Sequence, residues 1–136
     1  MFLFRRIGFC RDGFRRNGVR RNRPRVTVDE ARSRTSGDRP DAVLLDVREK
    51  PEWAAGHAPG AVHVPLTKLV AGATLPAQAQ GRPLVVICRS GHRSQQAAKL
   101  LAGRGAQAVD VEGGMNAWAA AGHPVVDERG NSGCIT

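Results

Sequence analysis

The sequence predicts an α/β fold in which a central, mostly parallel β-sheet lies between two layers of helices. Two apolar runs, residues 42–46 and 84–87, contain no polar residue before the aspartate that ends the first run, as in strands covered on both faces. Segments with helix start and stop signals separate the apolar runs, which is typical of βαβ units. With 136 residues, the chain has the size of one domain and can bury a substantial core.

The first half of the chain contains two helices with recognisable boundaries. Thr27 and Glu30 have the spacing of a capping box, which predicts a helix beginning near residue 27. Pro51 fits the first turn of a second helix, and Gly56 fits its end. The expected order is a helix at 27–34, a turn at 36–40, a strand at 42–46, a short helix at 51–55 and a strand at 61–64.

The second half contains the clearest strand and the longest helix. Residues 84–87 include β-branched side chains on both faces, as a buried parallel strand does. Ala97, Ala98 and Leu101 fall on one stripe of a helix that glycines close. The expected order is one or two helical turns at 66–70, loop through Gln80, a strand at 84–87, a helix at 92–102, a strand at 108–111 and a helix at 116–121.

The positive charge of the chain is concentrated at its N-terminus. The net charge is +9, but residues 1–25 contain nine arginines and one aspartate, so the remainder carries only +1. We therefore expect a basic, disordered extension at 1–25, a globular domain at 26–126 and a C-terminal tail at 127–136. The extension lacks the apolar segment of a secretory signal, although its composition also fits a transit peptide or a polyanion-binding segment. Nucleic acid is not an expected partner of the nearly neutral domain.

The cysteines and the hydropathy indicate a thiol protein in a reducing compartment. No stretch approaches the roughly eighteen apolar residues that a membrane helix needs, so no membrane partner is expected. Cys10, Cys88 and Cys134 are odd in number and scattered, which fits neither a disulfide framework nor a metal-binding pattern. We expect no metal and no cofactor, and a cytoplasmic location, or an organellar matrix if the extension is a transit peptide.

The segment CRSGHRS, residues 88–94, is the strongest candidate for a reactive site. It directly follows the strand at 84–87, and ligand sites of parallel α/β folds lie at the carboxyl ends of strands. The N-terminus of the next helix and the charges of Arg89 and Arg93 would favour the thiolate form of Cys88. The loop therefore predicts an anion cradle around a nucleophilic cysteine.

Cys88, four further residues and then Arg93-Ser94, after an apolar strand, resemble the active-site loop of the rhodanese family of sulfurtransferases. The resemblance extends over about residues 26–126 and implies a three-layer α/β/α rhodanese-like domain. Two further signatures of the family agree in order and spacing: Leu45–Arg48 with residues 52–61, and Glu112–Gly114 with Trp118.

The resemblance also implies an activity. Cys88 would take a sulfane sulfur from a small donor such as thiosulfate, become a persulfide, and pass the sulfur to cyanide, a thiol or a protein acceptor. Phosphatases that share this fold have five residues between cysteine and arginine, whereas four residues separate Cys88 from Arg93. The shorter loop favours sulfur transfer over phosphate chemistry.

The candidate site residues have three expected roles. Cys88 would carry the sulfur. Asp46 and Arg48, at the end of one strand, and Glu112, at the end of another, would support the site. Asp46 would either accept hydrogen bonds from loop amides or pair with an arginine. The substrate-binding group, which would hold an anionic donor and stabilise the persulfide through backbone N–H groups, is Arg89, Ser90, Gly91, His92, Arg93 and Ser94.

Two other functions fit parts of the sequence. A non-catalytic rhodanese module would bind a partner, but inactive modules commonly lack the cysteine that this chain retains as Cys88. Alternatively, the extension at 1–25 would bind polyanions, and the domain would take no part in that function. Cys134 lies near a flexible C-terminus, where it would be a spare thiol, accept sulfur from Cys88 or form a disulfide with it.

Overall fold

The computed structural model describes residues 25–136, in which five parallel strands form one sheet with the order β1-β5-β4-β2-β3. Strand β4 is central, with β5 on one side and β2 on the other. Parallel neighbours require crossover connections, so this arrangement confirms the predicted α/β class. The strands are β1 (Arg25–Val26), β2 (Val43–Asp46), β3 (Val62–His63), β4 (Leu84–Ile87) and β5 (Ala108–Val111).

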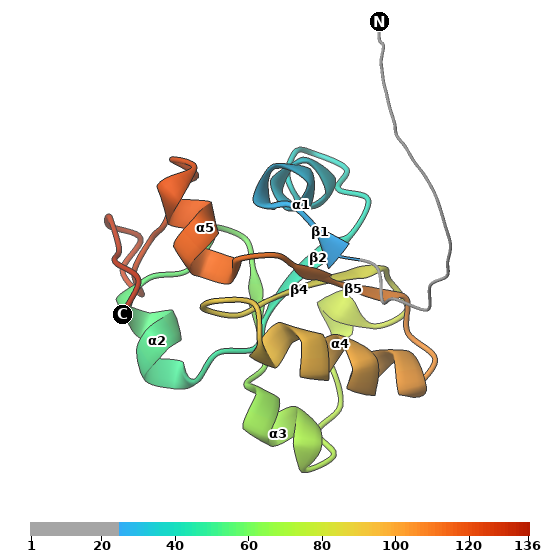
Figure 1. The fold of residues 1–136 in the computed structure, drawn as a ribbon. Coiled ribbons are helices and arrows are strands. Elements are labelled where there is room, and N and C mark those ends of the chain that lie inside the picture. The colour runs from blue at the N-terminus through green and yellow to red at the C-terminus, as the bar shows by residue number, and fades with distance from the viewer. Residues whose placement is uncertain (1–24) are drawn as a thin grey trace, which may run out of the picture.

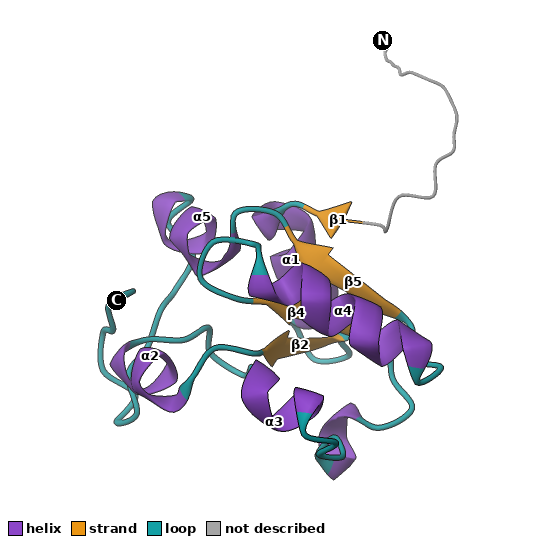
Figure 2. Ribbon diagram, turned by 60° about the horizontal axis from the view of Figure 1, so that its bottom comes forward, coloured by secondary structure: helices purple, strands orange, loops and turns teal. Residues whose placement is uncertain are grey.

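Helices cover both faces of the sheet and form the predicted three layers (Figure 1, Figure 2). One layer consists of α1 (Val28–Thr35) and α5 (Gly114–Ala120). The opposite layer consists of α3 (Leu66–Val70), α4 (Arg93–Gly103) and the short 3₁₀ helix η1 (Ala77–Ala79). Helix α2 (Lys50–Ala55) lies beyond the carboxyl end of β2, beside the loop that joins β4 to α4 (Figure 2).

The core is divided by the sheet into two apolar clusters. All residues of β2 and β4 are buried, and successive side chains of a strand point to opposite faces. Leu45 and Val86 pack in the cluster with α3 and α4, whereas Leu44 and Val85 pack in the cluster with α1 and α5. The apolar runs in the sequence therefore reflect strands buried on both sides, as predicted.

Local signals place the helix ends where the sequence predicts them. The Glu30 N–H donates to Oγ1 of Thr27 at 3.1 Å, which confirms the N-cap of α1. Pro51 lies in the first turn of α2, and Gly56 caps the end of that helix. Strand β1 was not predicted because no apolar run marks it after the arginine-rich segment, unlike the equally short β3. The helix η1 was not predicted because three residues carry no periodic pattern.

The two ends of the domain differ from expectation in part. The predictions for residues 1–24, including Cys10, lie outside the described residues. Arg25, assigned to the extension from its composition, belongs to β1 and pairs in register with Asp110. The tail folds back toward the end of α2. Val126, just before the tail, forms one bridge with His57, just after α2, and another with Ser132 of the tail.

The last residues of the tail also contact α2. The Cys134 N–H donates to the Ala55 carbonyl at 2.9 Å, so the expected flexible terminus is packed against the domain. Within the part of the chain that the structure describes, no helix is long and apolar enough to cross a membrane.

Candidate active site

Cys88 follows the last residue of β4 and is almost fully buried, with 1% of its surface exposed. The backbone around it is held by the start of α5. The Met115 N–H donates to the Cys88 carbonyl at 2.7 Å, and the Asn116 N–H donates to the Arg89 carbonyl at 2.9 Å. Gly114 lies so close that a Cβ atom there would be 2.3 Å from the Cys88 carbonyl oxygen. The glycine therefore allows α5 to clamp the reactive loop.

Two hydrogen bonds define the surroundings of the Cys88 sulfur. The Gly91 N–H donates to Sγ at 3.1 Å, and the thiol lies 3.4 Å from Oγ of Ser94, to which it donates. Gly91 has φ of +102°, a left-handed conformation that turns its N–H inward and strains any residue with a Cβ. Among the described residues, Gly91 is the loop member whose amide reaches Sγ. Of the loop N–H groups expected to stabilise an anion on the sulfur, the structure places that of Gly91 against Sγ.

Ser94 connects Cys88 to a buried carboxylate on the next strand. Its hydroxyl donates to Oδ2 of Asp110 at 3.2 Å, and both Ser94 and Asp110 are fully buried. Arg25 donates to the same carboxylate from Nε and Nη2 at 3.0 to 3.3 Å, and its Nη2 also reaches the Gly91 carbonyl at 3.1 Å. The hydrogen bonds from Arg25 to Asp110 raise the pKa of this guanidinium above its ordinary value, and the nearby Cys88 adds to the effect.

Arg93 forms a bidentate ion pair with Glu52 of α2. Nη1 and Nη2 lie 2.7 and 2.8 Å from the two carboxylate oxygens. The hydrogen bonds from Arg93 lower the pKa of Glu52 below its ordinary range, and the same pair raises the pKa of Arg93. The expected substrate-binding arginine therefore also joins the reactive loop to α2.

Asp46 and Arg48 form a second, fully buried ion pair at the end of β2. Nε and Nη2 of Arg48 bind the Asp46 carboxylate at 2.8 to 3.1 Å, and Nη2 also donates to the Gly56 carbonyl at 2.6 Å. The side chains of both partners have 0% exposure. Both predicted roles of Asp46 are seen: it pairs with an arginine, and its Oδ1 also accepts a hydrogen bond from the backbone N–H of Arg48 at 3.0 Å. Through the bond of Arg48 to the Gly56 carbonyl, the pair holds the end of α2.

The remaining predicted site residues lie at the rim. Arg89 and His92 are exposed on the loop, and Oγ of Ser90 lies 3.2 Å from Nδ1 of His92. Glu112 is also exposed, and its backbone N–H donates to the Val26 carbonyl at 2.9 Å, which ties β5 to β1. The structure therefore brings the loop, the strand ends and the start of α5 together around Cys88.

Comparison with known proteins identifies the family to which this geometry belongs. The family model of the Rhodanese-like domain matches residues 27–121. The chain belongs to the rhodanese-like family. A protein named Sulfurtransferase from Allochromatium vinosum is 34% identical over 103 residues, which cover 74% of this chain and 94% of that protein.

The chain also resembles a solved structure and part of a longer protein. The crystal structure of a rhodanese-related protein from Thermoplasma volcanium superposes with a TM-score of 0.64 at 28% identity, covering 76% of this chain and 97% of the other. Adenylyltransferase and sulfurtransferase UBA4 from Yarrowia lipolytica is 38% identical over 77 residues, or 57% of this chain. This match spans only 19% of that protein's length. Membership of the family, with relatives named sulfurtransferases, supports a rhodanese-type sulfurtransferase.

Several residues that shape the rhodanese site were not assigned to it from the sequence. Glu52 falls within a family signature but was given no role in the site, and neither Asp110 nor Arg25 was assigned to it. Each pairs with a residue far away in the chain: Glu52 with Arg93, and Arg25 with Asp110 across 85 positions. The sequence signal that could have found Asp110 is its place in β5, next to the apolar Val109 and Val111, where a carboxylate requires a partner.

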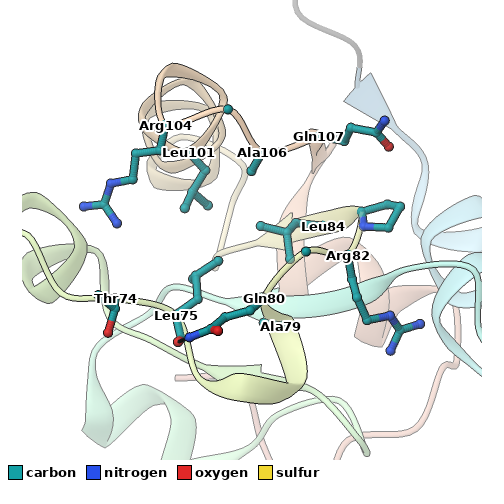
Figure 3. Close-up of a pocket in the computed structure, with 13 residues that line it drawn as sticks. Thr74, Leu75, Ala79, Gln80, Arg82, Leu84, Leu101, Arg104, Ala106 and Gln107 are labelled. Atoms are coloured by element: carbon teal, nitrogen blue, oxygen red, sulfur yellow. Dashed lines mark hydrogen bonds between the residues drawn. The ribbon is translucent and has the colours of Figure 1, made fainter.

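A cavity of about 560 Å³ lies at the edge of the sheet opposite to Cys88 (Figure 3). It is lined by Leu84, the first residue of β4, and by Leu101, with Arg104 at its margin. The Arg104 guanidinium donates to the carbonyls of Leu69 and Ala73 at 2.7 and 2.9 Å. Because Cys88 follows the other end of β4, this cavity takes no part in chemistry at the rhodanese loop.

Proposed function

We propose that this rhodanese domain is a sulfurtransferase that carries a sulfane sulfur on Cys88 as a persulfide. The observation that supports the proposal most strongly is the environment of Sγ: a buried cysteine at a strand end, with the Gly91 N–H at 3.1 Å inside a loop of four residues between cysteine and arginine. A hydrogen-bond donor that points at the sulfur stabilises the negatively charged thiolate or persulfide more than it stabilises a neutral thiol.

In the first step, the Cys88 thiolate attacks the outer sulfur of a donor such as thiosulfate. The bond from Sγ to that sulfur forms as the bond between the two donor sulfurs breaks, and sulfite leaves with the electron pair. The negative charge then resides on the terminal sulfur of the persulfide. The Gly91 N–H, 3.1 Å from Sγ, and the Ser94 hydroxyl, 3.4 Å from it, are the groups that would stabilise this charge.

In the second step, a thiophilic acceptor attacks the terminal sulfur. A cyanide carbon or a thiolate forms the new bond, the sulfur–sulfur bond to Cys88 breaks, and the electron pair returns to Sγ. Thiocyanate or an acceptor persulfide is released. The chemistry needs free thiols, and Cys88 and Cys134 are both unpaired, so we place it in a reducing compartment such as the cytoplasm.

We infer that Arg89 attracts the anionic donor to the loop. Arg93 is already committed to Glu52, and Arg25 to Asp110, whereas the exposed Arg89 makes no side-chain hydrogen bond to another described residue. A fixed charge at the mouth of the site raises the local donor concentration and weakens with salt. A protein that delivers an acceptor thiol would meet the same exposed rim.

The test is to incubate the full chain with thiosulfate and measure its intact mass. We expect the mass of one added sulfur atom, which cyanide removes as thiocyanate. The Cys88→Ser variant should gain none, and the matched Cys134→Ser variant should gain sulfur normally. No added sulfur with thiosulfate, polysulfide or a persulfide donor would contradict the proposal and favour a partner-binding module instead.

A further inference from the structure

A chain of four side chains connects the reactive sulfur to the N-terminal strand. Sγ of Cys88 lies 3.4 Å from Oγ of Ser94, and Oγ lies 3.2 Å from Oδ2 of Asp110. Arg25 of β1 binds both oxygens of the Asp110 carboxylate and the carbonyl of Gly91. Cys88, Ser94 and Asp110 are buried, while the Arg25 side chain is 33% exposed. The chain therefore runs from the surface to the reactive atom.

The Ser94 hydroxyl has one proton, and this limits what the chain can do. With a neutral thiol, Cys88 donates to Oγ of Ser94, and Ser94 donates to Asp110, so every group is satisfied. A thiolate or persulfide can only accept. The Ser94 proton then goes either to the sulfur or to the Asp110 carboxylate, and not to both.

Arg25 decides how strongly Asp110 competes for that proton. A buried carboxylate with no other partner would keep the Ser94 hydroxyl and would repel the negative charge on sulfur. Arg25 supplies two donors and a positive charge to Asp110, so the carboxylate remains satisfied when Ser94 turns to the sulfur. Its bond to the Gly91 carbonyl also holds the residue whose N–H donates to Sγ.

We propose that Asp110 and Arg25 control the reactivity of Cys88 through the Ser94 hydroxyl, with Asp110 opposing the anionic sulfur and Arg25 supporting it. Both are positioning residues, because they act on Cys88 through Ser94. The proposal deepens the proposed sulfurtransferase function and rests on it for its biological meaning. Arg25 lies just before residue 27, where the match to the family model begins.

Other charged groups also act on the Cys88 sulfur, but they are the same in the parent protein and in variants at positions 25 and 110. Cys88 contributes to the raised pKa of Arg93, which is itself paired with Glu52, and Glu112 contributes to the raised pKa of Arg25. These groups alter the absolute reactivity of Cys88, but the difference between two variants at positions 25 and 110 isolates the proposed chain. Among the described residues, the other charged or titratable groups at this end of the sheet are Asp46, Arg48, Glu52, Arg89, His92, Arg93 and Glu112.

The test is the pH dependence of Cys88 alkylation by iodoacetamide, followed by peptide mass spectrometry so that Cys10 and Cys134 do not contribute. Asp110→Asn keeps the shape and one acceptor but removes the charge, and we expect the midpoint of the curve to move to lower pH by about half a unit or more. Arg25→Met should move the midpoint to higher pH by a similar amount. A purely structural role predicts no such opposition of sign.

Three controls sharpen the result. Arg25→Lys retains the charge and should keep the midpoint near that of the parent, whereas Arg82→Met, at the opposite edge of the sheet, should leave it unchanged. In a Ser94→Ala background, the effect of Asp110→Asn should shrink to less than half. If Arg25→Met does not fold, as judged by thermal melting, the alkylation curves of Asp110→Asn and Arg25→Lys still test the proposal.

Movement of both midpoints in the same direction, or no movement in Asp110→Asn, would overturn the proposal. Alkylation requires neither a sulfur donor nor an acceptor. This proposal can therefore fail while Cys88 still takes up sulfur, and the sulfurtransferase proposal can fail while the midpoints move as expected.

Discussion

The strands of the sheet all have their carboxyl ends on one side and their amino ends on the other, here called the carboxyl edge and the amino edge. The two edges differ in how far their polar side chains are buried. At the carboxyl edge, Asp46, Arg48, Ser94 and Asp110 are polar and fully buried. At the amino edge, apolar side chains such as Leu84 and Leu101 line the cavity together with uncharged polar ones, and its arginines lie exposed against backbone carbonyls (Figure 3). Buried charges are costly unless they are paired, whereas exposed ones contribute little. The reactive edge should therefore tolerate change far less than the opposite edge.

The largest difference in stability should come from the buried ion pair of β2. Arg48→Met leaves the Asp46 carboxylate buried without its partner and should lower the free energy of unfolding by about 3 to 5 kcal/mol. The exposed Arg104→Met, which loses hydrogen bonds to two carbonyls at the other edge, should lower it by about 1 kcal/mol or less. Urea unfolding of the three proteins measures both changes.

A second variant separates lost pairing from lost packing at this site. Replacing both partners, in Asp46→Leu with Arg48→Met, removes the unpaired charge and should recover part of the stability lost in Arg48→Met alone. Equal stability losses in Arg48→Met and Arg104→Met would show that the two edges do not differ in the way their burial indicates.

Glycines offer the next comparison. Gly114→Ala places a Cβ atom 2.3 Å from the Cys88 carbonyl oxygen at a φ of +57°, so the clamp on the reactive loop must open. We expect a loss of about 2 to 4 kcal/mol and at least a tenfold fall in sulfur transfer. Gly105→Ala, at φ of +94° with nothing within 4 Å, should cost about 1 kcal/mol and leave transfer unchanged.

Thermal unfolding and the rate of thiocyanate formation would be measured on the same samples of these glycine variants. A Gly114→Ala protein that transfers sulfur at the parent rate would show that α5 does not hold the loop in its reactive shape.

The smallest expected effect is the pH dependence of the Glu52–Arg93 pair. The folded-state pKa of Glu52 lies below its unfolded value because Arg93 donates to the carboxylate. The pair therefore contributes its full stabilisation above the unfolded pKa, and this contribution is lost as pH falls through the lower, folded pKa. Because both side chains are partly exposed, we expect a contribution under about 1 kcal/mol.

Urea unfolding of the parent and of Glu52→Gln at pH 7 and pH 3 tests this sign. The difference between the two proteins should be present at pH 7 and should be smaller at pH 3, where less of Glu52 is ionised. A difference that grows at pH 3 would contradict the assignment of the ionised Glu52 to the pair.

Most regular elements could be predicted because their signals are local. The N-cap at Thr27 and the apolar run at 84–87 each depend on neighbours within a few positions, and both predictions were confirmed. Strand β1 was missed because no apolar run marks it, unlike the equally short β3, and its pairing with β5 depends on a partner 85 positions away. Arg25 was therefore grouped with the arginines that precede it.

The sequence by itself determined the class of fold, the reactive loop and the count of four residues between Cys88 and Arg93, because all of these follow from the order of residues along the chain. Only the tertiary structure decided which charges meet. It pairs Arg93 with Glu52 and joins Arg25 to Ser94 through Asp110, because parallel strands bring their carboxyl ends to one edge from distant parts of the chain. Burial then requires that the charges inside that edge, such as Asp46 and Asp110, be paired, and each is paired with an arginine.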